Sequence, residues 1–372
     1  MSRLRILSSI VLILSFFLVQ CNNNLDKGQD EKDSEKDSLT SFEKIEKTDT
    51  SEHIIDAINF SKSFYKHYRG NYFGKQAELD LMIIRELVVF TLYYYPEYQI
   101  VTNVVNLQKK GFSYAYINDF RDTLEYWQAS FVSNSKLLLH ITTSVIDTDY
   151  VFREDYTNAV PLQVVEIDTT LTMLDDTSKE ILKVSLSSVY TSKFRLNFLK
   201  DSFSLQKDVN DAIDDLLKYL SRLKKEEIET MFFPYNIDKF VTVEYNNKGL
   251  LVIGFNYYSY YGGAHGSNNL EFYNIDVLNK KVLKITDVLD TSGLTLKIFE
   301  KIKDIDDLFI DSDELYIPQN FILKGRKFFV VYNVYEIGSY ALGPIIVEFD
   351  FSEIKENLKK EFLESFYPNI KL

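Results

Sequence analysis

A short glycine-rich stretch holds the residues whose types and spacing are best suited to chemistry. Gly262, Gly263, Ala264, His265 and Gly266 form the densest glycine cluster in a chain that has only 13 glycines among 372 residues. A histidine can act as a general base, and glycine-rich loops can bind phosphate. The stretch lacks both the Lys-Ser/Thr ending of a phosphate loop and the Gly-x-Ser-x-Gly of a nucleophile elbow. Three roles remain open for His265: a catalytic base, a structural bend bonded to a neighbouring loop, or part of a binding surface.

The other candidate ligands do not have the spacing of a metal site. His53, His67 and His140 show no ligand spacing to one another or to His265. The acidic stretch 304–315 lacks the glycine and the spacing of an EF-hand, so a solvated helix end is expected there in preference to calcium. A single cysteine allows neither an intrachain disulfide nor an all-cysteine metal site. The sequence therefore predicts no cofactor.

A second cluster with possible function follows the last histidine by about seventy residues. We expect Glu336 to cap a turn or to pair with Arg326 or Lys327. Tyrosines just before His265 and around Glu336 are either half-buried strand residues or a binding face for protein or glycan. These tyrosines are Tyr257, Tyr258, Tyr260, Tyr261, Tyr332, Tyr335 and Tyr340.

The N-terminus has the pattern of a secreted, lipid-anchored protein. Arg3 and Arg5 precede an apolar run, 6–19, that is too short to span a bilayer but suits a signal peptide. The run FLVQC resembles the lipobox of bacterial lipoproteins, although Gln20 replaces the usual small residue before the cysteine. We expect residues 1–20 to be a lipoprotein signal peptide and Cys21 to carry the lipid. Residues 21–50 are polar and charged, and they predict a flexible tether.

Composition and patterning predict a β-rich chain that does not bind nucleic acid. The net charge is −13, which opposes binding to phosphates, and 28 Phe and 26 Tyr with only 6 Pro favour strands. A possible short helix from Glu52 opens a β-rich N-terminal module, 52–155, built as a small barrel or sheet. Two amphipathic helices are expected later, at 208–230 with Asp208 as its N-cap, and at 294–310. Strands pair locally around these helices without βαβ alternation, so the fold class is α+β with antiparallel sheets.

Three ordered blocks resemble one known family. YYGGAHGSNNLEFYNID, the following VLKITDVL, and NVYEIGSYALGP are similar to the RsiV-like C-terminal domain. Residues 160–260 resemble the α+β domain that usually precedes it, which leaves 261–372 as the RsiV-like domain. The resemblance implies an extracytoplasmic protein, since such domains occur in the RsiV anti-sigma factor, whose outer domain binds lysozyme, and in the non-catalytic part of a peptidoglycan deacetylase. The anti-sigma and deacetylase activities are not expected here.

These observations lead to one expected function and one alternative. We expect a non-catalytic lipoprotein in the envelope of a Gram-negative bacterium, held to the membrane by its lipid anchor. Its ligand would be an envelope protein, by resemblance a lysozyme-like one, or a peptidoglycan-related glycan. Gly262, Gly263, His265, Tyr335, Glu336 and Tyr340 are the residues expected in its binding or structural loop. The alternative is an envelope hydrolase in which His265 works with a nearby carboxylate.

Overall fold

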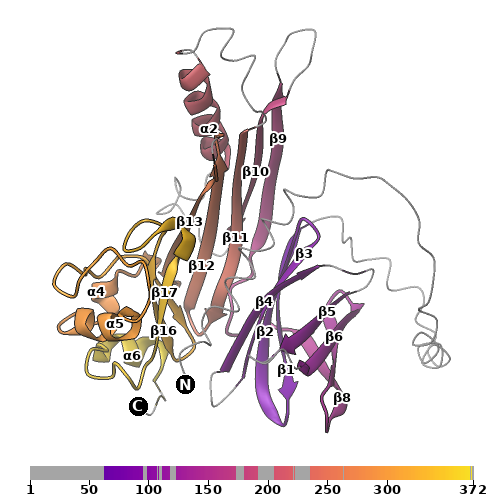
Figure 1. Cartoon of the computed structure of the whole chain (residues 1–372). Helices are drawn as coiled ribbons and strands as arrows, with labels where there is room; N and C mark the ends of the chain where they lie inside the picture. The colour runs from indigo at the N-terminus through magenta and orange to yellow at the C-terminus, as the bar shows by residue number, and fades with distance from the viewer. Residues whose placement is uncertain are drawn as a thin grey trace.

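A computed structural model describes residues 63–94, 99–106, 108, 111–117, 123–172, 180–191, 205–220, 222, 235–262, 264–368 and 370. The expected signal peptide, Cys21, the tether, the helix from Glu52, His53 and Gly263 lie outside these residues. Within them, no helix combines the length and apolar character that crossing a membrane requires. A long central sheet lies between an N-terminal sheet, drawn in indigo to magenta, and a C-terminal region in orange to yellow (Figure 1).

The N-terminal sheet has eight antiparallel strands in the order β4-β3-β2-β1-β8-β7-β6-β5. Its outer strands approach each other through a bridge between Gln108 and Gly111, so the sheet is nearly closed, as a small barrel would be. Along one strand Leu137, Leu139 and Ile141 are buried, because alternate residues point to the interior. The strands are β1 (Phe64–Tyr72), β2 (Lys75–Ile84), β3 (Leu87–Tyr94), β4 (Gln99–Asn106), β5 (Gly111–Ile117), β6 (Thr123–Ser133), β7 (Lys136–Thr142) and β8 (Asp147–Glu154).

A tight turn sets the register of the first hairpin. Phe73 and Gly74 connect β1 to β2 with φ of 49° and 75°, the conformation that two-residue hairpin turns favour. Tyr72 therefore lies opposite Lys75, and the hairpin keeps this register without a shift as far as Phe64 opposite Ile83. The hairpin register thus decides which polar residues of β1 and β2 face each other.

The central sheet has six strands in the order β14-β13-β12-β11-β10-β9. The strands are β9 (Gln163–Thr172), β10 (Glu180–Tyr190), β11 (Tyr235–Asn247), β12 (Leu250–Tyr260), β13 (Ser267–Asp276) and β14 (Lys281–Val282). All neighbours are antiparallel except β10 and β11, which run parallel with helix α2 (Leu205–Leu220) between them in the chain. The expectation that no βαβ unit occurs was therefore wrong at this place. A parallel pair needs a crossover of a dozen or more residues, which the segment between these strands supplies.

Helix α2 packs its apolar face on the central sheet. Val209 and Leu216 are buried against Leu182 and Tyr235. The helix begins at Leu205, so that the expected N-cap, Asp208, lies inside its first turn. Asp208 instead accepts a hydrogen bond from the buried Lys239 Nζ at 2.6 Å, and the same ammonium lies over the Phe255 ring. A contact across the fold thus replaces the expected cap.

The C-terminal region combines a three-stranded antiparallel sheet with short helices. Its sheet contains β15 (Phe321–Lys324), β16 (Lys327–Tyr332) and β17 (Ile345–Asp350), and its helices are α4 (Ile285–Val288), α5 (Leu294–Ile302), the 3-10 turn η4 (Tyr340–Leu342) and α6 (Lys360–Phe366). The helix expected over 294–310 ends at Ile302. Asp307 then takes a φ of 64°, and Leu308 forms a β-bridge with Gly338. This part of the acidic stretch therefore forms turns that pack against the loop between β16 and β17.

Asparagine side chains join the central sheet to the C-terminal region. Asn274 accepts from the Leu323 N–H at 2.9 Å and donates to a neighbouring backbone carbonyl. Asn320 accepts from the Phe272 N–H and donates to the Leu270 carbonyl. Asn333 accepts from the Leu270 N–H and donates to the same carbonyl. Side-chain amides offer both a donor and an acceptor, so they can satisfy the backbone of a strand whose neighbour is short. Apart from the one parallel pair, the antiparallel α+β architecture is confirmed.

Candidate binding surface

Two glycines of the GGAHG loop serve different purposes. Gly262 has a φ of 87°, a conformation that glycine adopts at little cost. Gly266 is needed for space, because a Cβ there would lie 2.5 Å from the ring of Tyr258. The loop after β12 is therefore a tightly packed bend, which explains its glycine content without a bound phosphate.

His265 is exposed beside this bend and stacks on Tyr340. The two rings lie 3.9 Å apart at an interplanar angle of 18°, and Nδ1 is 3.0 Å from the carbonyl oxygen of Gly266. Among the described residues, no carboxylate lies within ion-pair distance of the ring, so the partner that the hydrolase alternative requires is not found there. Instead of bonding a neighbouring loop, the side chain is placed by stacking.

The block around Tyr335 continues the same surface. The Tyr335 and Tyr340 rings lie 5.6 Å apart, and Tyr335 is 57% exposed. Tyr316 donates to Glu336 at 3.0 Å, and burial together with this contact raises the pKa of Tyr316 to about 12. Phe309 lies beside this block, with its N–H 3.0 Å from the Ile337 carbonyl. His265, Phe309, Tyr316, Tyr335 and Tyr340 together are called the aromatic surface below.

The structure removes one alternative for each of two residues in this region. Among the described residues Glu336 forms no ion pair with Arg326 or Lys327; its contact is the Tyr316 hydroxyl, and Lys327 pairs with Glu348 at 2.5 Å. Tyr332 does not belong to an exposed tyrosine face, because it is completely buried and donates to a backbone carbonyl. The strand alternation of β16 points its ring inward.

The tyrosines in and after β12 do not belong to the aromatic surface. Tyr257 and Tyr258 of β12 are half-buried, and Tyr261, which follows the strand, is 47% exposed beside Tyr235. Across the described part of the chain, no three His, Cys, Asp or Glu residues gather as they would around a metal ion.

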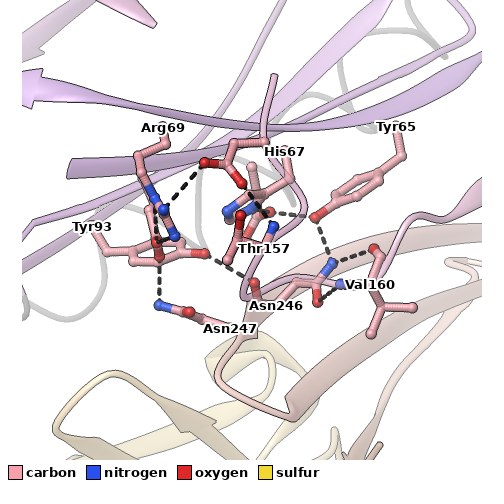
Figure 2. Close-up of polar contacts among 11 residues, drawn as sticks. Tyr65, His67, Arg69, Tyr93, Thr157, Val160, Asn246 and Asn247 are labelled. Carbon is pink, nitrogen blue, oxygen red and sulfur yellow. Dashed lines mark hydrogen bonds and ion pairs between the residues drawn. The ribbon is translucent and has the colours of Figure 1, made fainter. Parts of the chain in front are cut away.

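A buried polar network that the sequence did not reveal lies where the N-terminal sheet meets the central sheet (Figure 2). His67 Nδ1 lies 2.8 Å from Asp80 Oδ1, and both side chains are almost completely buried. Tyr65 donates to the same carboxylate. Burial and then the charge of Asp80 raise the pKa of Tyr65 well above its usual value, which keeps its hydroxyl protonated. No substrate can reach a pair so enclosed, so we assign it a structural role.

Asn246 connects this network to the rest of the molecule. Its amide donates to the Tyr65 hydroxyl and to the Val160 carbonyl, both at 2.7 Å, and its oxygen accepts from the Val160 N–H at 2.9 Å. Tyr93 donates to the Asn246 carbonyl at 3.1 Å. One side chain of β11 thus holds β1 of the N-terminal sheet and the segment that follows β8 (Figure 2).

A second arm of the network contains an ion pair. Arg69 lies 3.1 Å from Glu78 and 3.1 Å from Asp155, and Asn247 donates to the buried Glu78 at 2.5 Å. The turn at Phe73 would have predicted the facing pairs of β1 and β2, because it fixes the hairpin register. The contacts with Asn247 have no such local signal.

Comparison with known proteins identifies two domains. Residues 163–268 match the family model of deacetylase PdaC, and residues 276–352 match that of a protein of unknown function, DUF3298. A solved DUF3298 family member from Bacteroides fragilis is 21% identical, with 57% of this chain and 99% of that chain covered and a TM-score of 0.45. A DUF3298 family protein from Pseudomonas aeruginosa is 15% identical, with coverages of 56% and 98% and a TM-score of 0.39. No curated protein matches the chain. The chain therefore contains a PdaC-type domain, which includes the GGAHG loop, followed by a DUF3298 domain.

Proposed function

We propose that this chain is a non-catalytic protein of the bacterial cell envelope that binds another envelope protein through the aromatic surface. The observation that carries the proposal is the run of three stacked or adjoining rings from two separate loops, in which the half-buried Tyr340 lies between the exposed His265 and Tyr335. Exposed tyrosines give large contact areas at low cost in side-chain entropy, and they are enriched at the centres of protein interfaces.

The geometry of the aromatic surface supports binding over catalysis. His265 is held by a ring and by a backbone carbonyl, and neither can accept and pass on a proton as a carboxylate partner would. The backbone around Tyr335 also has a defined turn. Tyr335 takes a φ of 67° within a turn that closes from the Glu336 N–H to the Asn333 carbonyl, so its ring is presented by a fixed backbone.

Envelope location is part of the same proposal. The PdaC-type and DUF3298 matches and the lipobox-like sequence at Cys21 support a lipoprotein of a Gram-negative envelope. Cys21→Ala tests the anchor by membrane fractionation. We expect the variant to move to the soluble fraction, and unchanged membrane association would contradict lipidation.

Site-specific photo-crosslinking in intact envelopes tests the binding surface. A photoreactive residue at Tyr335 should give a discrete protein adduct, which mass spectrometry would identify, and a lysozyme-like partner would be recognised in this way. The matched control is Tyr126, which is 43% exposed on the N-terminal sheet. Equal adducts at both positions, or none at Tyr335, would refute the proposal.

A further inference from the structure

A groove of about 590 Å³ lies on the central sheet, on the face opposite helix α2. Leu182 and Leu186 of β10 point toward α2, and the intervening Lys183 and Ser185 line the groove. Its volume is within the range of roughly 300–1,000 Å³ that small-molecule sites occupy. Neither matched family description nor the proposed function assigns a role to this groove.

The register of the strands arranges polar side chains across the floor of the groove. Asp168, Ser185, Asp238 and Tyr258 stand directly opposite one another on β9, β10, β11 and β12. Side chains paired in this way share a face and lie within about 5 Å of their neighbours. The floor is therefore a row that combines two carboxylates, a hydroxyl and an aromatic ring.

The charges of the groove are already paired within the protein. Lys183 lies 2.8 Å from Glu180, and Arg85, at the tip of the β2–β3 hairpin, reaches both oxygens of Asp238 at 3.0 and 3.2 Å. Asp168 accepts a hydrogen bond from Ser185 and lies 3.9 Å from the same Arg85 guanidinium. Burial raises the pKa of Asp238 despite Arg85, consistent with a position on the floor of the groove. An ionic ligand would have to compete with these pairs, and a neutral one would not.

We infer that this groove binds a neutral oligosaccharide. Sugar hydroxyls both donate and accept, and a carboxylate has about four acceptor positions, so Asp168 and Asp238 can accept further bonds while remaining paired. Tyr258, half-buried against Gly266, adds aromatic surface at one end of this polar row. This inference concerns a second site and does not depend on the protein partner of the aromatic surface.

The two sites adjoin but can be separated by mutation. Tyr258 at one end of the groove touches Gly266, next to His265. Thr170 lines the other end, on β9, three strands away, which corresponds to about 14 Å. A change at Thr170 therefore affects the groove without reaching the aromatic surface.

Titration calorimetry with chitotetraose and cellotetraose tests the inference. We expect saturable binding of at least one of these neutral tetrasaccharides to the full-length protein. Thr170→Arg should abolish it by filling the groove, and Asp168→Ala should weaken it about tenfold by removing a charged acceptor. Both positions are exposed, so the fold should persist. Thr148→Arg, at an exposed site on β8, is the matched control and should bind as the wild type does.

Three results would overturn the inference. The first is the absence of saturable heat with both tetrasaccharides. The second is equal binding of a tetrasaccharide by the wild type and by Thr170→Arg. The third is binding of tetralysine in place of the sugars, which would indicate a cationic partner. The photo-crosslink at Tyr335 should persist in Thr170→Arg, so failure of the groove and failure of the aromatic surface give different results.

Discussion

Replacing Asn246 with alanine should uncouple the N-terminal sheet from the central sheet. The substitution removes three hydrogen bonds, one to Tyr65 and two to the backbone of Val160. The Tyr65 hydroxyl keeps its bond to Asp80, but both backbone groups of Val160 lose their partner in a buried position. Each unsatisfied buried group costs about 1–3 kcal/mol, so for the two groups we expect a loss of about 2–6 kcal/mol.

The single tryptophan makes this effect measurable at a distance. Trp127 is buried in the N-terminal sheet, whereas Asn246 belongs to the central sheet. Urea unfolding followed by tryptophan fluorescence therefore reports on the sheet that was not mutated. With a urea slope of about 3 kcal/mol per molar, the upper end of the usual range because the slope grows with chain length, the midpoint should fall by about 0.7–2 M.

An exposed asparagine provides the control. Asn269→Ala removes only a 3.4 Å contact with Ser267 on the surface of β13, so its free energy of unfolding should stay within about 0.5 kcal/mol of that of the wild type. If Asn246→Ala leaves the Trp127 transition unchanged, the network does not couple the sheets and the reasoning is wrong.

Three further substitutions test individual contacts. Asp208→Asn leaves the buried Lys239 ammonium without its carboxylate and should cost about 3–5 kcal/mol, well above the 0.5–2 kcal/mol of a lost helix cap, measured by hydrogen exchange in α2. Burial tends to raise the pKa of Glu244, but Lys324 at 2.6 Å outweighs it and lowers that pKa. The pair therefore stabilises the fold above about pH 4.3 and loses this contribution as the pH falls through the lowered value, a dependence that hydrogen exchange in β15 should show and Glu244→Gln should lack. Gly266→Ala should lower stability by about 1–3 kcal/mol, because its Cβ overlaps a tyrosine ring; an unchanged melting temperature would show that the ring can move away.

The strands were predictable because their signal is local. Alternating apolar residues mark most of the strands from β2 to β17, although β6 and β8 were not predicted individually, and turns at Lys248 and Lys324 separate two of the hairpins. Phe64–Tyr72 was less clear, since it carries four aromatic residues, a histidine and two basic residues in nine positions. The hairpin turn at Phe73 was the usable evidence that this segment is a strand.

The parallel pairing of β10 with β11 could not be read from the sequence. Each strand has the same alternation whether its neighbour runs parallel or antiparallel, so only the path of the chain through α2 decides the direction. The same limit applies to Asp208. A carboxylate near a helix start satisfies the rule for a cap, yet Lys239, 31 residues away in the chain, determines its actual contact.

The sequence by itself determined the β-rich α+β class, the glycine requirement of the GGAHG loop and the family resemblance, because these depend on residues close together in the chain. Only the tertiary structure decided what surrounds His265 and what holds the two sheets together. Stacking of His265 on Tyr340 joins residues 75 positions apart, and the bond from Asn246 to Tyr65 joins residues 181 positions apart. Contacts of this length depend on how whole sheets pack, and local patterns carry no information about that packing.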